Sequence, residues 1–432
     1  MQETPFLTDL DQRAAVKGSR DPLGIQQIWT RLGRHVVGNL TTVSDSVRDF
    51  TTLLLGYYFA EQLVADADPG TELATFLKWE QLAAYARAAA NHDYGFRGTE
   101  RVRRRLTEGS IVTVSDDRAH QILSNQKIYG LWGLYSVPAR ASGLLQQDPP
   151  RLTPTARDFV ERTYLPVLIE GSGADARRIR EILRARSKRV DIGGAEAPVI
   201  KALGRVLRKT LSTKERDFYR GHLLHGGPDD ATHGIQQQLA ELLNETLEEE
   251  AFAWSITRVG ALAKDARRRG PDWQPLSDYL SRIRTCESVL APVSMLFTYL
   301  LALDGKSVDT TAKRLRDAWG PGLRTVEHAA FSEMRDDIAG VDSQESNRWV
   351  GIADALATGR YADLIDSLVV QNKTVMGARG GAAWLEKRAG RLHVRFRDEQ
   401  GELPTRQEIP NLWRFPYFLE SLRNVAVAVR AE

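Results

Sequence analysis

The sequence is poor in cysteine, with Cys286 as the only one among 432 residues. A single cysteine cannot form a disulfide within the chain. No positively charged segment followed by an apolar stretch and a cleavage site opens the sequence, which argues against a secretory leader. We therefore expect a protein of a reducing compartment, the cytoplasm.

Long apolar runs are also lacking. The longest stretch, Val289 to Leu303, contains Pro292 and is about fifteen residues long, whereas a membrane-spanning helix needs about twenty. This stretch predicts a buried core helix and no membrane partner.

The common signatures of catalysis are missing too. The sequence has no Gly-x-x-x-x-Gly-Lys-[Ser/Thr], Gly-x-Gly-x-x-Gly, Gly-x-Ser-x-Gly, His-Glu-x-x-His or paired Cys-x-x-Cys motif. Nucleotide hydrolysis, dinucleotide chemistry and zinc proteolysis therefore lose most of their support. Cys286 lies within an apolar-striped segment, so we expect it in a core rather than as a nucleophile. No cofactor is expected on these grounds.

Helical periodicity is what the sequence has in abundance. Apolar residues recur every three or four positions over 25–64, 71–90, 235–269 (one long helix or a pair) and 275–303, the pattern of helices with one buried face. Two short segments instead predict strands, the β-branched run 111–114 and the alternating run 392–396.

Positive charge is concentrated in one region. Residues 174–220 hold 14 Lys and Arg against 6 Asp and Glu, although the whole chain has a net charge of only +3. A helix over 174–188 presents Arg177, Arg180, Arg184 and Lys188 at helical spacing, and Arg205 and Arg208 follow in a second helix. Such arrays suit phosphates, which accept paired hydrogen bonds and release counterions when neutralised. A solvated helix face is the alternative interpretation.

The segment 114–165 combines helices and a hairpin in a specific order. We expect helices over 115–124 and 126–135, a short helix starting at Pro138 and ending at Gly143, and a polar loop. The segment Leu152-Thr153-Pro154 then leads into a last helix, with Thr153 as its cap. This succession resembles the winged-helix DNA-binding domains, although Ala156 replaces the family's usual glycine. The resemblance implies contacts to double-stranded DNA by the short helix and the wing, at Lys127, Ser136, Arg140 and Arg151. The wing is short and poor in charge, so a role as a protein-contact module is the equal alternative.

A histidine cluster is the candidate metal site. His222, His225, Asp229 and His233 fall within twelve residues, and imidazole with carboxylate is a ligand set for zinc, manganese or iron. Alternatively, the histidines end a helix that Gly226 stops, and Asp229 or Asp230 caps the next helix.

Three short segments, 19–24, 38–42 and 413–418, are similar to uncharacterised bacterial proteins encoded among anti-phage defence genes, which implies a context. The sequence as a whole predicts a mainly α protein with a multi-helical body, an embedded winged-helix module and a small C-terminal α+β cap. Its expected parts are an N-terminal helical layer (1–96), a winged-helix-like module (97–170), basic helices with the helical body (171–376) and the α+β module (377–432).

The leading hypothesis is a non-enzymatic DNA-binding subunit or adaptor with protein partners, of a defence or DNA-processing complex. Two alternatives remain open, a divalent-metal-dependent hydrolase or nuclease that uses the histidine cluster, and a protein-interaction scaffold that binds no nucleic acid.

Overall fold

The computed structural model describes residues 21–63, 69–169, 175–249, 252–323, 327–340, 342–397 and 401–430. These residues are mainly helical, with three small antiparallel sheets of two strands each, so the predicted α class is confirmed. The chain divides into two compact units that alternate along the sequence. Unit 1 comprises the residues up to Val36 and Glu249–Tyr417, and unit 2 comprises Val37–Glu248 and the residues from Phe418 onward.

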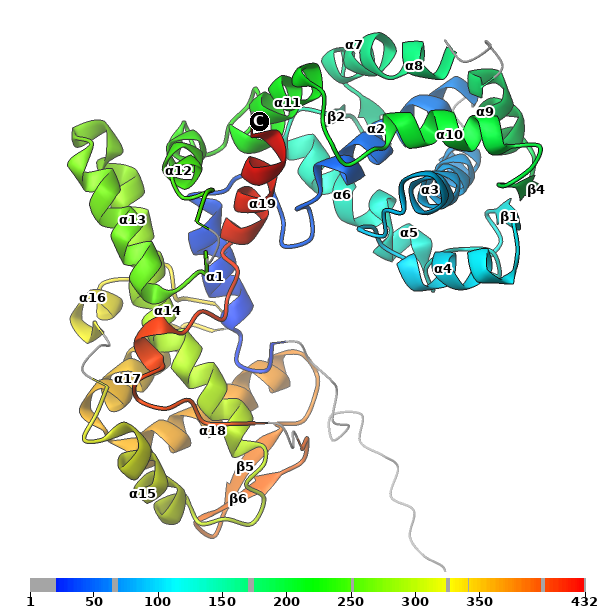
Figure 1. The fold of residues 1–432 in the computed structure, drawn as a ribbon. Helices are drawn as coiled ribbons and strands as arrows, with labels where there is room; N and C mark the ends of the chain where they lie inside the picture. Colours follow the sequence, from blue (N-terminus) through cyan, green and yellow to red (C-terminus); the bar gives the residue numbers. More distant parts are fainter. Residues whose placement is uncertain are drawn as a thin grey trace, which may run out of the picture. The chain divides into compact units, whose positions relative to one another are not determined.

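Unit 2 is built around two long helices, α2 and α3, which pack against each other (Figure 1). Its elements are α2 (Val47–Leu63), α3 (Pro69–Asn91), α4 (Thr99–Glu108), β1 (Ile111–Ser115), α5 (Gln126–Tyr129), α6 (Leu131–Ala141), β2 (Leu145–Gln146), β3 (Arg151–Leu152), α7 (Pro154–Thr163), α8 (Leu165–Ile169), α9 (Asp175–Arg184), β4 (Ser187–Asp191), α10 (Ala197–Val206), α11 (Thr213–Tyr219), a π-helical turn (Arg220–Leu224), α12 (Ile235–Asn244) and α19 (Leu419–Val429).

Helix α2 is buried on all sides from Val47 to Ala60, as expected of a central helix. Gly56 permits close packing on α3, because a Cβ atom there would lie 2.7 Å from the ring of Phe76. Buried charges join distant segments of the unit. Arg48 of α2 donates to Glu215 of α11 over 2.6 Å, and both side chains are almost fully buried.

Unit 1 is organised around α14, against which α1, α13 and α16 pack. Its elements are α1 (Ile25–Arg34), α13 (Ile256–Arg268), a 3-10 turn (Pro271–Trp273), α14 (Gln274–Leu300), α15 (Val308–Trp319), α16 (His328–Ser332), α17 (Glu345–Thr358), α18 (Tyr361–Ala378), β5 (Leu385–Arg388), β6 (Arg391–Val394) and a second 3-10 turn (Ile409–Asn411).

The apolar stretch that begins at Val289 lies in α14, where Cys286 and nearly all of its neighbours are buried. This confirms the expected core helix and the core position of the cysteine. Among the described residues, no helix is both long and apolar enough to cross a membrane.

Several local predictions are wrong. Ser115 ends β1, and the residues from 116 to 125 form turns rather than a helix. The helix expected over 126–135 is divided at Gly130, whose backbone is extended between α5 and α6. The position requires glycine, because a side chain there would collide with the carbonyl of Gln126 and the carboxylate of Glu80. Pro138 lies inside α6 rather than at the start of a helix.

The expected parts of the chain also differ from the observed ones. Helix α1 belongs to unit 1, whereas the rest of the expected N-terminal layer belongs to unit 2. The expected C-terminal module is divided as well. Its hairpin β5–β6 contacts α18 in unit 1, and α19 contacts α11 and α12 in unit 2.

Candidate functional site

Helix α9 of unit 2 separates apolar from cationic side chains. Ile179, Ile182 and Leu183 are buried, whereas Arg177 and Arg184 are exposed on the other side. Arg180 is half-buried. The helix ends at Arg184, so the expected helix over 174–188 is too long, and Lys188 lies on β4 opposite Val114 of β1.

Helix α10 adjoins α9 (Figure 1) and carries a second cationic face. Lys201 and Arg205 are exposed and four residues apart, which places them on one face of α10. At a rise of 1.5 Å per residue, Lys201 and Arg205 are about 6 Å apart along the helix axis. Neighbouring residues, such as Leu203 and Val206, are buried. Arg208 is also exposed but lies beyond the end of α10 at Val206, so its expected position in the second helix is wrong.

The acidic residues of this region are engaged with other partners. Glu196 receives a 2.5 Å hydrogen bond from Arg178, which also donates to Glu181. Asp191 accepts a hydrogen bond from Ser110. Arg178 is therefore used internally. Among the described residues, no carboxylate forms an ion pair with nine other cations of this region, namely Arg177, Arg180, Arg184, Arg186, Lys188, Arg189, Lys201, Arg205 and Arg208. These nine residues of α9, the 186–189 segment, α10 and the segment that follows α10 are called the basic surface below.

The four residues taken from the winged-helix resemblance have different environments. Lys127 and Arg140 are exposed, and Arg140 lies 3.7 Å from Asp148. Ser136 is buried, with its hydroxyl 2.8 Å from that of Tyr57, so a contact with a DNA groove does not fit its position. Arg151 donates to the buried carboxylate of Glu72 over 2.8 Å, which ties β3 to α3.

The surface of α5 and α6 is apolar rather than basic. Ile128, Tyr129 and Val137 are 52%, 48% and 64% exposed. The topology also differs from the expected module, because β1 pairs with β4, outside the segment, and the β2–β3 hairpin stands as a separate sheet. Thr153 does cap α7 with Pro154 in its first turn, as predicted. The winged-helix assignment itself stays a prediction.

The histidine cluster is not assembled into a metal site. The Nδ1 atom of His222 lies 2.8 Å from the carbonyl oxygen of Ser142, and burial lowers its pKa. Burial also lowers the pKa of His225. Asp230 accepts hydrogen bonds from Thr232 and from the backbone of Gly234, just before α12. Within the described ranges, no three His, Cys, Asp or Glu side chains, including Asp229 and His233, are placed together to hold a metal ion.

The segments behind the defence resemblance have structural roles. Ser19 and Arg20 lie outside the described residues, but Asp21 accepts a 2.8 Å hydrogen bond from the backbone of Ile25 at the start of α1. In unit 2, Asn39 donates to the carbonyl of His222 and to the hydroxyl of Ser142.

Three residues of the segment 413–418 donate hydrogen bonds to a buried carboxyl group in unit 1. The backbone N–H groups of Arg414 and Phe415 and the hydroxyl of Tyr417 all donate to Glu287. Burial raises the pKa of Glu287 to about 7. In unit 2, burial likewise raises the pKa of Glu80 to about 7. Neither carboxyl group is exposed to solvent, so we interpret both as structural.

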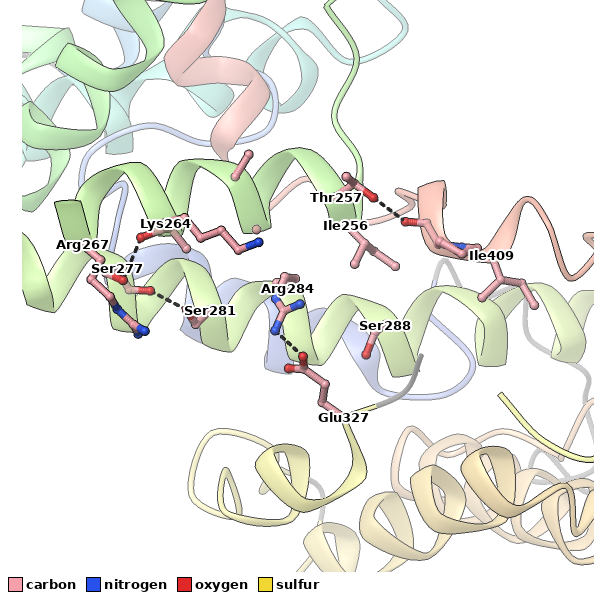
Figure 2. Close-up of a pocket in the computed structure, with 14 residues that line it drawn as sticks. Ile256, Thr257, Lys264, Arg267, Ser277, Ser281, Arg284, Ser288, Glu327 and Ile409 are labelled. Atoms are coloured by element: carbon pink, nitrogen blue, oxygen red, sulfur yellow. Dashed lines mark hydrogen bonds and ion pairs between the residues drawn. The ribbon is translucent and has the colours of Figure 1, made fainter. Parts of the chain in front are cut away.

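A groove between α13 and α14 is a second candidate site (Figure 2). It lies within unit 1 and has a volume of about 680 Å³. Most of its lining residues are small or polar, and one end is apolar. The lining consists of Ile256, Thr257, Gly260, Ala261, Ala263, Lys264, Arg267, Ser277, Ser281, Arg284, Ser288, Glu327, Ile409 and Pro410. These residues are called the unit 1 groove below. The sequence analysis did not predict this groove. Residues 277, 281, 284 and 288 nevertheless form a polar stripe along an otherwise apolar helix, a pattern that could have indicated a polar site there.

Comparison with protein-family models, curated proteins and solved structures gives no match. The residues of this chain are therefore the basis for its proposed function.

Proposed function

We propose that the protein binds duplex DNA through the basic surface of unit 2, as a non-enzymatic subunit or adaptor of a DNA-associated complex. The main support is the number of unpaired cations: none of the nine residues of the basic surface forms an ion pair with a described carboxylate. Arg178, on the same helix as three of them, forms two ion pairs. Exposed cations without partners repel one another, and a phosphate backbone relieves that repulsion while releasing its counterions.

The proposal concerns phosphates rather than base sequence. The surface of α5 and α6 offers mainly Ile128, Tyr129 and Val137, with Lys127 and Arg140 as nearby cations. Phosphate contacts position a protein on DNA without reading its sequence. We therefore expect affinity to depend strongly on salt and weakly on sequence. We further propose a defence context, in which catalysis would belong to another chain.

The test is a salt titration with a fluorescently labelled duplex and a single strand of equal length. The wild type is compared with Arg177→Ala/Arg184→Ala and with Arg205→Ala/Arg208→Ala. Each lost phosphate contact reduces the slope of log affinity against log salt by about 0.9, so each double variant should lose about 1.8.

A matched control removes two cations from the same unit that already have local partners. Arg104 and Arg162 are exposed and ion-paired with Glu108 and Asp158 on their own helices. The variant Arg104→Ala/Arg162→Ala should bind like the wild type. Absence of duplex binding at low salt, or an equal loss in this control, would refute the proposal. Binding of a protein partner with little salt dependence would instead support the scaffold alternative.

A second comparison separates phosphate binding from groove reading. Lys127→Ala/Arg140→Ala should leave affinity for unrelated duplexes nearly unchanged if the basic surface is the main contact. A loss confined to particular sequences would instead favour insertion of α6 into a major groove.

A further inference from the structure

Three consecutive arginines at the end of α13 have three different environments. Arg268 forms a 3.0 Å ion pair with Asp265. The guanidinium of Arg269 lies 4.5 Å above the ring centre of Trp273. Arg267 lines the unit 1 groove, and among the described residues no carboxylate forms an ion pair with it. If the three arginines only compensated the dipole at the C-terminal end of α13, their surroundings would not need to differ.

Lys264 lines the groove one helical turn before Arg267, again without an ion pair to a described carboxylate. Side chains three residues apart on a helix are neighbours, so the two positive charges repel each other. Figure 2 shows Arg267 and Ser277 at one end of the groove, with the side chain of Lys264 extending from that end toward Arg284. This end therefore has an excess of positive charge, which an anion would stabilise.

Serine hydroxyls face these cations from α14. Ser277 donates to the carbonyl of Ala263, and Ser281 donates to the carbonyl of Ser277. In an α-helix, the carbonyl of Ser277 also receives the backbone N–H of Ser281. The Ser281 hydroxyl can therefore turn to an oxygen atom of a ligand without leaving that carbonyl unsatisfied.

The middle of the groove is electrically balanced. Arg284 forms an ion pair with Glu327, which also accepts a 2.8 Å hydrogen bond from Thr285. Gly260 makes room for this arginine, because a Cβ atom there would lie 2.9 Å from its Cδ atom. The balanced pair offers both donors and acceptors to the hydroxyl groups of a ligand.

The far end of the groove is apolar, with Ile256, Ile409 and Pro410. None of the described lining residues is aromatic, so the groove has no side chains on which successive bases of a nucleic acid could stack. The volume of about 680 Å³ lies within the range of small-molecule sites.

We propose that the unit 1 groove binds a phosphomonoester of nucleotide size. Lys264, Arg267 and Ser281 hold the phosphate, Arg284 and Glu327 hydrogen-bond to the hydroxyl groups, and the apolar end covers the remainder of the ligand. A guanidinium beside an ammonium matches the two charges of a phosphomonoester better than the single charge of a carboxylate. The site is independent of the basic surface, which belongs to unit 2.

The experiment is isothermal titration of the full-length protein with adenosine 5′-monophosphate, ribose 5-phosphate and adenosine. We expect the two phosphomonoesters to bind with dissociation constants below about 1 mM, and adenosine to bind at least about tenfold more weakly. Lys264→Gln/Arg267→Gln should weaken phosphomonoester binding at least about tenfold. Ala261→Phe, which fills the groove without changing its charge, should do the same.

The matched control is Arg268→Gln/Arg314→Gln, which removes two exposed cations of unit 1 outside the groove and should bind like the wild type. Failure of both phosphomonoesters to bind at about 1 mM would overturn the proposal, as would equal affinity for adenosine or an equal loss in the control. It would also be overturned if Lys264→Gln/Arg267→Gln lost duplex DNA binding while phosphomonoesters did not bind, because the groove would then contact a polymer.

Discussion

Glu287 makes the stability of unit 1 depend on pH in an unusual direction. Burial raises its pKa from 4.5 to about 7, despite the hydrogen bonds from Arg414, Phe415 and Tyr417. Between these two values the folded state keeps the proton and the unfolded state has lost it, so each rise in pH favours unfolding. The loss is complete above about pH 7. At 1.36 kcal/mol per unit, the shift corresponds to ~3 kcal/mol.

The variant Glu287→Gln removes this titration. The amide oxygen can still accept from the N–H groups of Arg414 and Phe415, and the amide nitrogen can donate to the hydroxyl oxygen of Tyr417. We expect the variant to match the wild type near pH 4, to exceed it slightly at pH 5 and to exceed it at pH 8 by up to ~3 kcal/mol. For a unit of this size, that is roughly 6–12 °C in the melting temperature.

Scanning calorimetry at several pH values between 4 and 8 measures the difference. Glu333→Gln, which replaces an exposed carboxylate of the same unit, is the control and should follow the wild type. Asp304 and Asp342 do not interfere. A hydrogen bond from the backbone of Val394 lowers the pKa of Asp304, and one from Arg348 lowers that of Asp342, so both titrate at lower pH. Parallel profiles for wild type and Glu287→Gln would refute the raised pKa.

Three further substitutions test the packing of the units by chemical denaturation. Arg48→Met should destabilise unit 2 by about 3–5 kcal/mol, because it leaves Glu215 buried without its charged partner. An unchanged midpoint would contradict the buried pair. Gly56→Ala should cost about 1–3 kcal/mol through collision with Phe76, so a neutral result would show that the two helices can move apart. Asp21→Ala removes the hydrogen bonds at the start of α1 and should cost about 1–2 kcal/mol in unit 1. Asp21→Asn should retain only part of that stability, because its one amide oxygen replaces one of the two accepting oxygens and its ion pair with Arg379 is lost.

Local structure was largely readable from the sequence where one residue determines it. Thr153 caps α7, as its side chain and the following proline predict. The β-branched run that starts at Ile111 forms β1, and Leu392 lies in β6. These predictions succeeded because the interactions lie within a few residues of one another.

Features that depend on distant residues could not be read. The requirement for glycine at position 130 depends partly on Glu80, which lies on another helix, and nothing near Gly130 in the sequence reveals that close approach. The strand position of Lys188 depends on pairing with β1. For the candidate site, the sequence identified the cations of α9 and α10, but not that Ser136 would be buried against Tyr57. The unit 1 groove required the packing of two helices whose individual patterns predict only an apolar face.

The alternation of the chain between the two units constrains the order in which the protein can mature on the ribosome. Helix α19 packs on α11 and α12, yet the whole of Glu249–Tyr417 is synthesised before it. Unit 2 must therefore wait, with the surface that α19 will cover still exposed, until the main part of unit 1 has been translated. No single continuous fragment of the sequence contains all of either unit, because each unit is formed by two separate segments. An isolated unit 2 would therefore need the segment with α19 joined directly after Glu248.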